Sequence, residues 1–301
     1  MPSRKKNPHD ALAHVTAEIT KLLERGVLPW RAPWNAELAQ AMTPGLPLRS
    51  TGQPYKGANV PLLWAAQIAR GFSRRTWLTL RQANELGGKV RKGEKACPVI
   101  FYGAAQPKPS DASASPEEDA RRYRFLKLFH VFNVEQCDGL ELPAEPAIAA
   151  SADLPALCDW VKRAGATVRV GGDKAFYAPS IDAICIPPVE AFLSDEYWTA
   201  TLAHEAIHFT GHKSRLDRLS DYATDRKARA REELTAELGS AIIGATIGLA
   251  PYHLEDHATY VADWLSAVRE EPRVFFSSAA KAQAAVDWLV EAAGPLDALS
   301  L

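Results

Sequence analysis

One stretch decides the fold of this 301-residue chain: His204-Glu205-Ala206-Ile207-His208. Residues four apart share one face of a helix, so both imidazoles can reach a single cation. Glu205, beside the first histidine, can then accept a proton from a metal-bound water. Ser194 is a good N-cap and Gly211 can end the helix, which favours a helix between them. We therefore expect a helical metal site with Glu205 as its catalytic base.

A catalytic zinc site needs a third protein ligand and leaves a fourth position to water. The metzincin pattern HExxHxxGxxH fails here, because its last position is Ser214, a poor zinc ligand. His212 follows Gly211, which is expected to break the helix before His212 could join the same face. The next helix offers Glu233 and Glu237, four residues apart on one face.

The spacing of these two acids resembles the gluzincin pattern ExxxD. We choose Glu233 as the third ligand and Glu237 as the carboxylate that hydrogen-bonds a ligating histidine; Glu237 as the ligand is the alternative. The expected ion is Zn²⁺, with Mn²⁺ or Co²⁺ also suited to such ligands. A second histidine pair, His253 and His257, falls among acids typical of a helix start, and we interpret it as structural.

Charge divides the chain into two unlike parts. The first 130 residues hold 21 Lys and Arg against 10 Asp and Glu, a net of +11, and the rest hold 14 against 26, a net of −12. Such a split suggests two domains with different partners, and the basic half points first to nucleic acid. Two domains that simply attract each other are the alternative.

In the basic half, aromatic residues alternate with cations between positions 29 and 101. Single-stranded nucleic acid binds such mixtures, because bases stack on aromatic rings while Lys and Arg meet phosphates. A core position is the alternative for each tryptophan. The candidate DNA-binding residues are Trp30, Trp34, Tyr55, Lys56, Asn59, Arg74, Arg75, Trp77, Arg81, Lys92 and Lys95.

The pattern predicts an α+β protein of two domains: a basic α+β DNA-binding domain over 1–141, a linker over 142–155, and a metallopeptidase-like α+β domain over 156–301. A Pro-, Ser- and Ala-rich stretch, 103–120, is expected to be a mobile loop on a hairpin. The four cysteines form no CxxC pair, and no apolar run is long enough for a membrane span or a signal, which predicts a cytoplasmic chain. Helices are expected at 8–25, 58–71, 80–86, 155–164, 194–210, 229–249, 254–270 and 277–293, and strands at 97–102, 123–133, 167–170, 174–177 and 183–186.

Five short motifs stand out in the basic half: Pro29-Trp30…Pro33-Trp34-Asn35, Thr51-Gly52…Tyr55-Lys56-Gly57-Ala58-Asn59, Trp77-Leu78-Thr79…Gln82-Ala83, Val90-Arg91-Lys92-Gly93-Glu94 and Val131-Phe132-Asn133-Val134-Glu135-Gln136. Together they resemble the N-terminal domain of ArdC antirestriction proteins, which also occurs in TraC-type plasmid primases. The acidic half contains HEAIHFTGH, SRLDR, REELTAELG and a Tyr260…Trp264 helix. These motifs resemble the ArdC zincin-like domain.

This resemblance implies a plasmid-borne bacterial protein that binds single-stranded DNA and protects entering DNA from host restriction during conjugation. It implies a zinc-dependent metallopeptidase site, with a peptide or protein as the substrate. One departure is Arg229, which stands where the family often has an aromatic residue. The alternative function is a non-enzymatic DNA-binding protein with a structural metal. A conjugative primase accessory ranks last, because the chain shows no separate acidic primase constellation.

Overall fold

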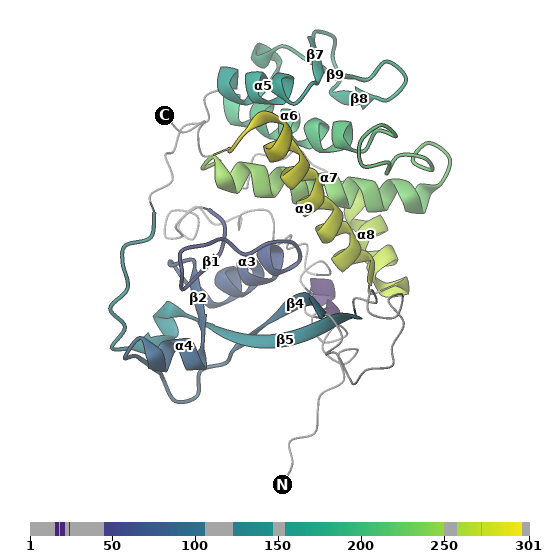
Figure 1. Cartoon of the computed structure of the whole chain (residues 1–301). Helices are drawn as coiled ribbons and strands as arrows, with labels where there is room; N and C mark the ends of the chain where they lie inside the picture. The colour runs from purple at the N-terminus through teal and green to yellow at the C-terminus, as the bar shows by residue number, and fades with distance from the viewer. Residues whose placement is uncertain are drawn as a thin grey trace, which may run out of the picture.

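The computed structural model describes residues 45–105, 123–146, 154–249, 258–271 and 273–296, with 16, 17, 19–21 and 24. Within these residues, a sheet with a covering helix forms the first half, and a set of long helices with a smaller sheet forms the second (Figure 1). The mixed helix and sheet content confirms the predicted α+β class. The expected histidine pair at 253 and 257, Trp30, Trp34 and most of the loop at 103–120 lie outside the described residues.

The first half is built on a four-stranded sheet in the order β1-β2-β5-β4. β1 runs parallel to β2, and the other neighbouring strands are antiparallel. Around the sheet lie two helices, a short ribbon of β3 and β6, and a 3-10 turn. The elements are β1 (Leu48–Arg49), α3 (Asn59–Arg70), β2 (Thr76–Thr79), α4 (Leu80–Glu85), β3 (Lys89–Val90), β4 (Cys97–Ala105), β5 (Tyr123–Asn133), η1 (Val134–Gln136) and β6 (Cys137–Asp138).

β2 is the longest of four short strands that sequence analysis missed, the others being β1, β3 and β6. It has only four residues and three of them are buried, so it shows no alternation of polar and apolar side chains. Trp77 lies at its centre, fully buried, with its ring edge-on to Phe72 at 5.8 Å between centroids. Short strands of this kind are recognised by their neighbours in the sheet rather than by their own sequence.

The stretch expected to be a linker begins as part of the first half. The carboxylate of Glu145 accepts hydrogen bonds from the backbone nitrogens of Arg75 and Thr76, at 2.9–3.2 Å, and from the Thr76 hydroxyl. This contact holds residues up to 146 against the start of β2. The next described element, α5 (Leu154–Arg163), begins inside the predicted linker, where Pro155 suits a first helical turn.

The second half surrounds one central helix. That helix, α6, contacts α5, α7 and α9 as well as strands β8 and β9 of the smaller sheet, whose order is β7-β9-β8. Because α6 is covered on several sides, 12 of its 16 residues are buried. The elements are β7 (Thr167–Val170), β8 (Phe176–Ala178), β9 (Ala183–Ile186), η2 (Val189–Ala191), α6 (Asp195–Thr210), α7 (Arg226–Thr246), α8 (Ala258–Glu270) and α9 (Arg273–Ala293).

Both ends of α6 differ in detail from the expected caps. Ser194 stands at the N-cap with extended backbone but makes no side-chain cap hydrogen bond. Gly211 ends the helix as predicted, at a φ of −78°, which many residues can adopt. Glycine is favoured here because a side chain would be crowded. A Cβ would lie 3.0–3.1 Å from the His208 carbonyl and the side chains of Leu219 and Arg218.

The two halves share one core. A single hydrophobic cluster includes Val60, Leu63 and Val99 of the first half together with core residues of the second half, from α5 to α9. The loop before α3 also reaches α9, where Lys56 forms an ion pair with Asp287 at 2.9 Å. The halves are therefore packed together rather than joined only by a tether. In the described part of the chain, no helix is long and apolar enough to cross a membrane.

Helices α6 and α7 approach closely at Gly239. A Cβ at this position would lie 2.7 Å from two side-chain carbons of Ile207, which is fully buried on α6. Such a distance is too short for two carbon atoms, so any side chain here would separate the helices.

We predict that Gly239→Ala destabilises the protein by about 1–3 kcal/mol, because the added methyl overpacks the α6–α7 contact. Ile207→Ala removes the three atoms that the methyl would meet, so the double variant should recover part of the loss. Urea unfolding of the single and double variants measures the coupling. Additive effects of the two substitutions would contradict the close contact.

An ion pair ties the turn between β8 and β9 to the segment after α6. Arg215 donates to Asp182 at 2.5 and 3.1 Å, and its guanidinium lies 3.7 Å from the centre of the Phe209 ring. Hydrogen bonds from Arg215, and then from Tyr177, lower the pKa of Asp182 from 3.8 to about 2 against the opposing effect of burial. The ionised carboxylate is therefore bound more favourably in the folded chain than in the unfolded one.

We predict that Asp182→Asn removes stability above pH 4 and removes little near pH 2. A lowered folded-state pKa gives stability that is present above the unfolded value and is lost as pH falls through the folded value. Because the Asp182 side chain is 42% exposed, solvent screening limits the loss to about 1 kcal/mol. Asparagine suits the positive φ of 48° at this position, so the substitution adds no backbone strain. Urea unfolding at pH 6 and pH 2.5 measures it, with the exposed Asp173→Asn as control; equal losses at both pH values would contradict the ion pair.

Candidate metal centre

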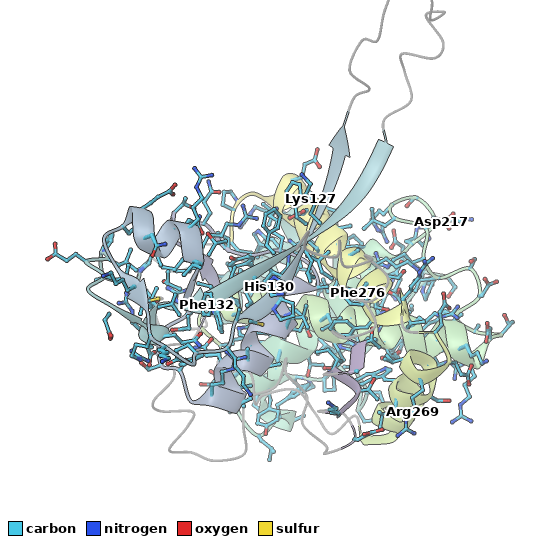
Figure 2. All side chains as sticks on the ribbon, turned by 90° about the horizontal axis from the view of Figure 1, so that it is seen from below. Lys127, His130, Phe132, Asp217, Arg269 and Phe276 are labelled. Atoms are coloured by element: carbon cyan, nitrogen blue, oxygen red, sulfur yellow. The ribbon has the colours of Figure 1, made fainter. Side chains whose placement is uncertain are left out.

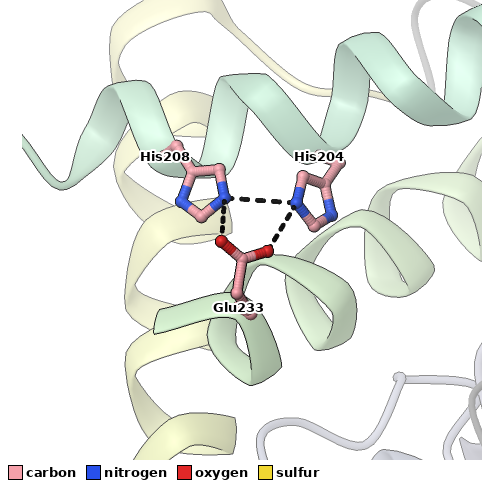
Figure 3. A group of neighbouring side chains, drawn as sticks. All are labelled: His204, His208 and Glu233. Atoms are coloured by element: carbon pink, nitrogen blue, oxygen red, sulfur yellow. Dashed lines mark hydrogen bonds and ion pairs between the residues drawn. The ribbon is translucent and has the colours of Figure 1, made fainter. Parts of the chain in front are cut away.

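Three side chains converge between α6 and α7 (Figure 3). The Nε2 atoms of His204 and His208 lie 3.1 Å apart. The two carboxylate oxygens of Glu233 face them, one at 3.4 Å from Nε2 of His204 and the other at 3.7 Å from Nε2 of His208. The structure thus brings together the three residues that sequence analysis proposed as ligands.

The spacing of these atoms suits a divalent metal ion. In a tetrahedral site with bonds of about 2.1 Å to nitrogen and oxygen, ligand atoms lie about 3.4 Å from one another. The three observed separations, 3.1, 3.4 and 3.7 Å, are centred on this value. All three residues are buried, and two imidazoles with one carboxylate form a donor set that zinc and similar ions accept.

Glu205 borders the cavity that opens beside the three ligand candidates. This cavity has a volume of about 290 Å³, and its polar side is formed by Glu205, Tyr222 and the three ligand candidates. A carboxylate beside an open coordination position can exchange a proton with water there. The other lining residues are mainly apolar: Ala175, Phe176, Tyr177, Pro179 and Leu219.

Glu232 is a site residue that sequence analysis missed. Its Oε1 atom lies 3.2 Å from Nδ1 of His208, the ring nitrogen that faces away from the cluster. Arg218 donates to both Glu232 oxygens at 3.0 Å, and also to the Ile207 carbonyl at 2.7 Å. Both partners are buried, so this ion pair fixes the orientation of the His208 ring.

Glu232 is thus the carboxylate that orients His208, and a contact of Glu237 with the other histidine stays a prediction. Glu237 is fully buried one turn further along α7. A usable signal was present in the sequence: Glu232 stands next to Glu233, and Arg218 belongs to the SRLDR motif. What the sequence did not show is that the loop after α6 folds back over α7.

Tyr222 makes a second contact that was not expected. Its hydroxyl donates to Glu233 at 2.5 Å, and its ring lies 5.8 Å from that of His208. Arg229, the departure from the family pattern, places its guanidinium 5.5 Å from the Tyr222 ring centre. The aromatic group beside the cluster thus comes from the preceding loop. His212 bonds to Ser214 and is not part of the cluster, as predicted.

The cluster favours positive charge. Burial lowers the pKa of His208, but hydrogen bonds from its ring to Glu232 and Glu233 outweigh burial and raise the pKa well above 6.5. Burial raises the pKa of Glu233, but His204 and His208 outweigh it and lower that pKa well below its usual range. The same carboxylates that stabilise protonated imidazoles can neutralise the charge of a bound metal ion.

Four of the predicted DNA-binding residues have structural positions instead. Trp77 is in the core, and Tyr55 is buried, which raises the pKa of its hydroxyl to about 12. Arg75 is buried beside Glu145. Both amide atoms of Asn59 bond the backbone of Ile100 on β4, at 2.7 and 2.8 Å. The predictions for Trp77, Tyr55 and Arg75 are wrong, and the Asn59 side chain is occupied in joining α3 to the sheet.

The other described candidates lie at the surface in different settings. Lys56 pairs with Asp287 and Arg81 with Glu85, while Arg74 lies 3.6 Å from Glu145. Lys92 and Lys95 are exposed. Exposed ion pairs of this kind are weak, so these cations remain able to meet a phosphate.

Comparison with known proteins matches each half to a family. Residues 9–132 match ArdcN, the N-terminal domain of the anti-restriction factor ArdC, and residues 155–281 match the zincin-like metallopeptidase MPTase-PolyVal. An uncharacterized protein of Sinorhizobium fredii, y4eC, is 35% identical over 94% of this chain and 92% of its own length. Two DNA primases TraC of Escherichia coli are 34% and 33% identical over 95% and 96% of this chain, which spans only 20% and 28% of their lengths.

Solved structures agree with these matches. The metal-free crystal structure of the antirestriction ArdC protein from plasmid R388 has a TM-score of 0.77 and 39% identity, covering 94% of this chain and 97% of that one. Its Mn(II)-bound structure has a TM-score of 0.76 and 40% identity over the same shares.

We predict that Glu232→Gln weakens Zn²⁺ binding about 10–100-fold, because the His208 ring loses the charged partner that orients it. His208→Ala should abolish stoichiometric binding. Competition with a chromophoric chelator measures the affinity, and circular dichroism of the metal-free protein checks folding. Glu291→Gln, exposed on α9, is the matched control. A folded Glu232→Gln protein with the affinity of the native chain would contradict this role.

Proposed function

This chain belongs to the ArdC family of antirestriction proteins, and on that premise we propose that it protects plasmid DNA from restriction during conjugation. Its basic half binds the entering single strand, and its zincin-like half is a zinc-dependent metallopeptidase. Restriction of entering DNA takes place in the bacterial cytoplasm, so the proposal requires the protein there.

The observation that carries the peptidase part is the three-residue cluster beside an open cavity. His204, His208 and Glu233 would hold the ion, and Glu205 borders the space next to them. Zinc bound there would act as a Lewis acid on a carbonyl and lower the pKa of water. A structural zinc site, by contrast, is closed by four protein ligands. The open cavity with a carboxylate at its side favours catalysis over the structural alternative.

The remaining residues bind and orient the reactants. Glu205 takes up a proton from the attacking water and delivers it to the departing amine, so the carboxylate is restored at the end of each turnover. The Tyr222 hydroxyl and the Glu232–Arg218 pair hold Glu233 and His208 in place. A peptide is positioned by β8, an edge strand of its sheet, whose Phe176 and Tyr177 border the cavity.

The DNA-binding part is supported by charge and by the relatives. The first 130 residues carry a net charge of +11, the electrostatic pattern typical of proteins that bind phosphate backbones. The named relatives include primases and an antirestriction protein, whose work concerns DNA. A structural metal in a purely DNA-binding protein is the second candidate, and Glu205 distinguishes the two.

We predict that Glu205→Gln keeps its metal and its affinity for single-stranded DNA but loses protection of a plasmid conjugated into a restricting recipient. Without the carboxylate, proton transfer fails, and peptide hydrolysis should fall about 10²–10⁴-fold. Transfer frequencies into restricting and non-restricting recipients measure protection. Glu190→Gln, exposed on η2, serves as control. Full protection by Glu205→Gln would show that peptidase chemistry is not needed and would favour the DNA-binding protein.

A further inference from the structure

The hairpin of β4 and β5 extends beyond the core that anchors it. Cys97 pairs with Val131 and Val99 with Phe129, so these residues share one face of the ribbon. Cys97, Val99 and Val131 are buried, whereas Phe129 is 44% exposed and Phe101, the next residue along this face of β4, is 49% exposed. Figure 2 shows the two strands running outward, with Lys127 further out than His130. The apolar face thus continues into solvent.

Phe101 and Phe129 form an exposed aromatic pair. Their ring centroids lie 6.2 Å apart at an interplanar angle of 82°, the diagonal contact expected across two strands. Among the described residues, the exposed large hydrophobic side chains include one other aromatic residue, Phe176, which borders the metal cavity. Two exposed rings on one projecting ribbon need an explanation other than core packing.

Charge indicates which partner the pair would meet. The 20 residues of β4 and β5 contain no Asp or Glu. Lys127 is exposed and pairs directly with Phe101 across the ribbon, so it lies on the same face as the two rings, whereas His130 pairs with Pro98 on the other face. Two rings beside a cation, with no carboxylate on either strand, suit a polyanion that also presents flat aromatic faces. The absence of Asp and Glu would not strengthen the binding of an apolar protein partner.

We propose that the face of the β4–β5 ribbon bearing Phe101, Lys127 and Phe129 is the platform on which bases of single-stranded DNA stack. This proposal rests on the single-strand binding of the proposed function and names the surface that performs it. It differs from the residues chosen by sequence analysis, among which Trp77 and Tyr55 are buried. Stacking requires no particular base, so binding by this ribbon is independent of sequence.

The test uses the full chain and a fluorescein-labelled oligothymidylate of about 20 nucleotides, followed by fluorescence anisotropy. Phe101→Leu with Phe129→Leu keeps apolar side chains but removes the aromatic faces, and we expect the affinity to fall at least about tenfold. Phe129→Trp should bind as tightly as the native chain. Lys127→Gln should reduce the slope of log affinity against log salt by about 0.7, the value for one phosphate contact on a single strand. Leu193→Ala, at an apolar side chain that is 88% exposed in the other half, is the control.

The outcomes separate this proposal from the one on which it rests. If the native chain binds the oligonucleotide and the folded double-leucine variant binds it equally well, the ribbon proposal is wrong and single-strand binding stands. If the native chain fails to bind, both proposals fall. Preference for duplex DNA by the native chain, retained in the leucine variant, would also overturn stacking on the ribbon. Thermal unfolding of each variant establishes that the ribbon is folded.

Discussion

The contact between Gly239 and Ile207 sets the distance between α6 and α7, and the metal cluster depends on that distance. The histidines come from α6 and Glu233 from α7, so their atoms meet at 3.1–3.7 Å only if the helix backbones lie close together. Two further contacts support this arrangement from the side. Arg218 joins the end of α6 to Glu232 on α7, and Gly211 leaves room for its guanidinium.

Sequence reasoning succeeded where the helix period alone decides the geometry. His204 and His208 are four residues apart, so their shared face follows from local structure. Glu233 was chosen because a third ligand was needed and an acidic helix followed, and the structure places its carboxylate beside both histidines. Glu232 was missed because its role depends on Arg218, which reaches it through a loop whose path the sequence does not reveal. Glu237 shares a face with Glu233 but lies one turn further along α7.

In the basic half, sequence reasoning predicted a class of partner but not the residues that would contact it. Its charge and composition predicted a DNA partner, but composition does not tell which rings are buried. Trp77 is inside because β2 lies between β1 and β5, a long-range pairing that its four residues do not announce. Phe101 and Phe129 are outside because their strands are longer than the core beneath them. Whether an aromatic residue is exposed thus depends on how the whole sheet is assembled, which the local sequence does not reveal.

Because one hydrophobic cluster spans both halves, neither half is complete when the gene encodes it alone. A recombination event that cut the gene between the halves would leave each product with uncovered apolar surface and with Lys56 or Asp287 lacking its partner. Such products would aggregate or be degraded, so selection would act against the cut. The two domains are therefore expected to be transferred between genes together. A longer protein that acquires one half by gene fusion should contain the other half as well.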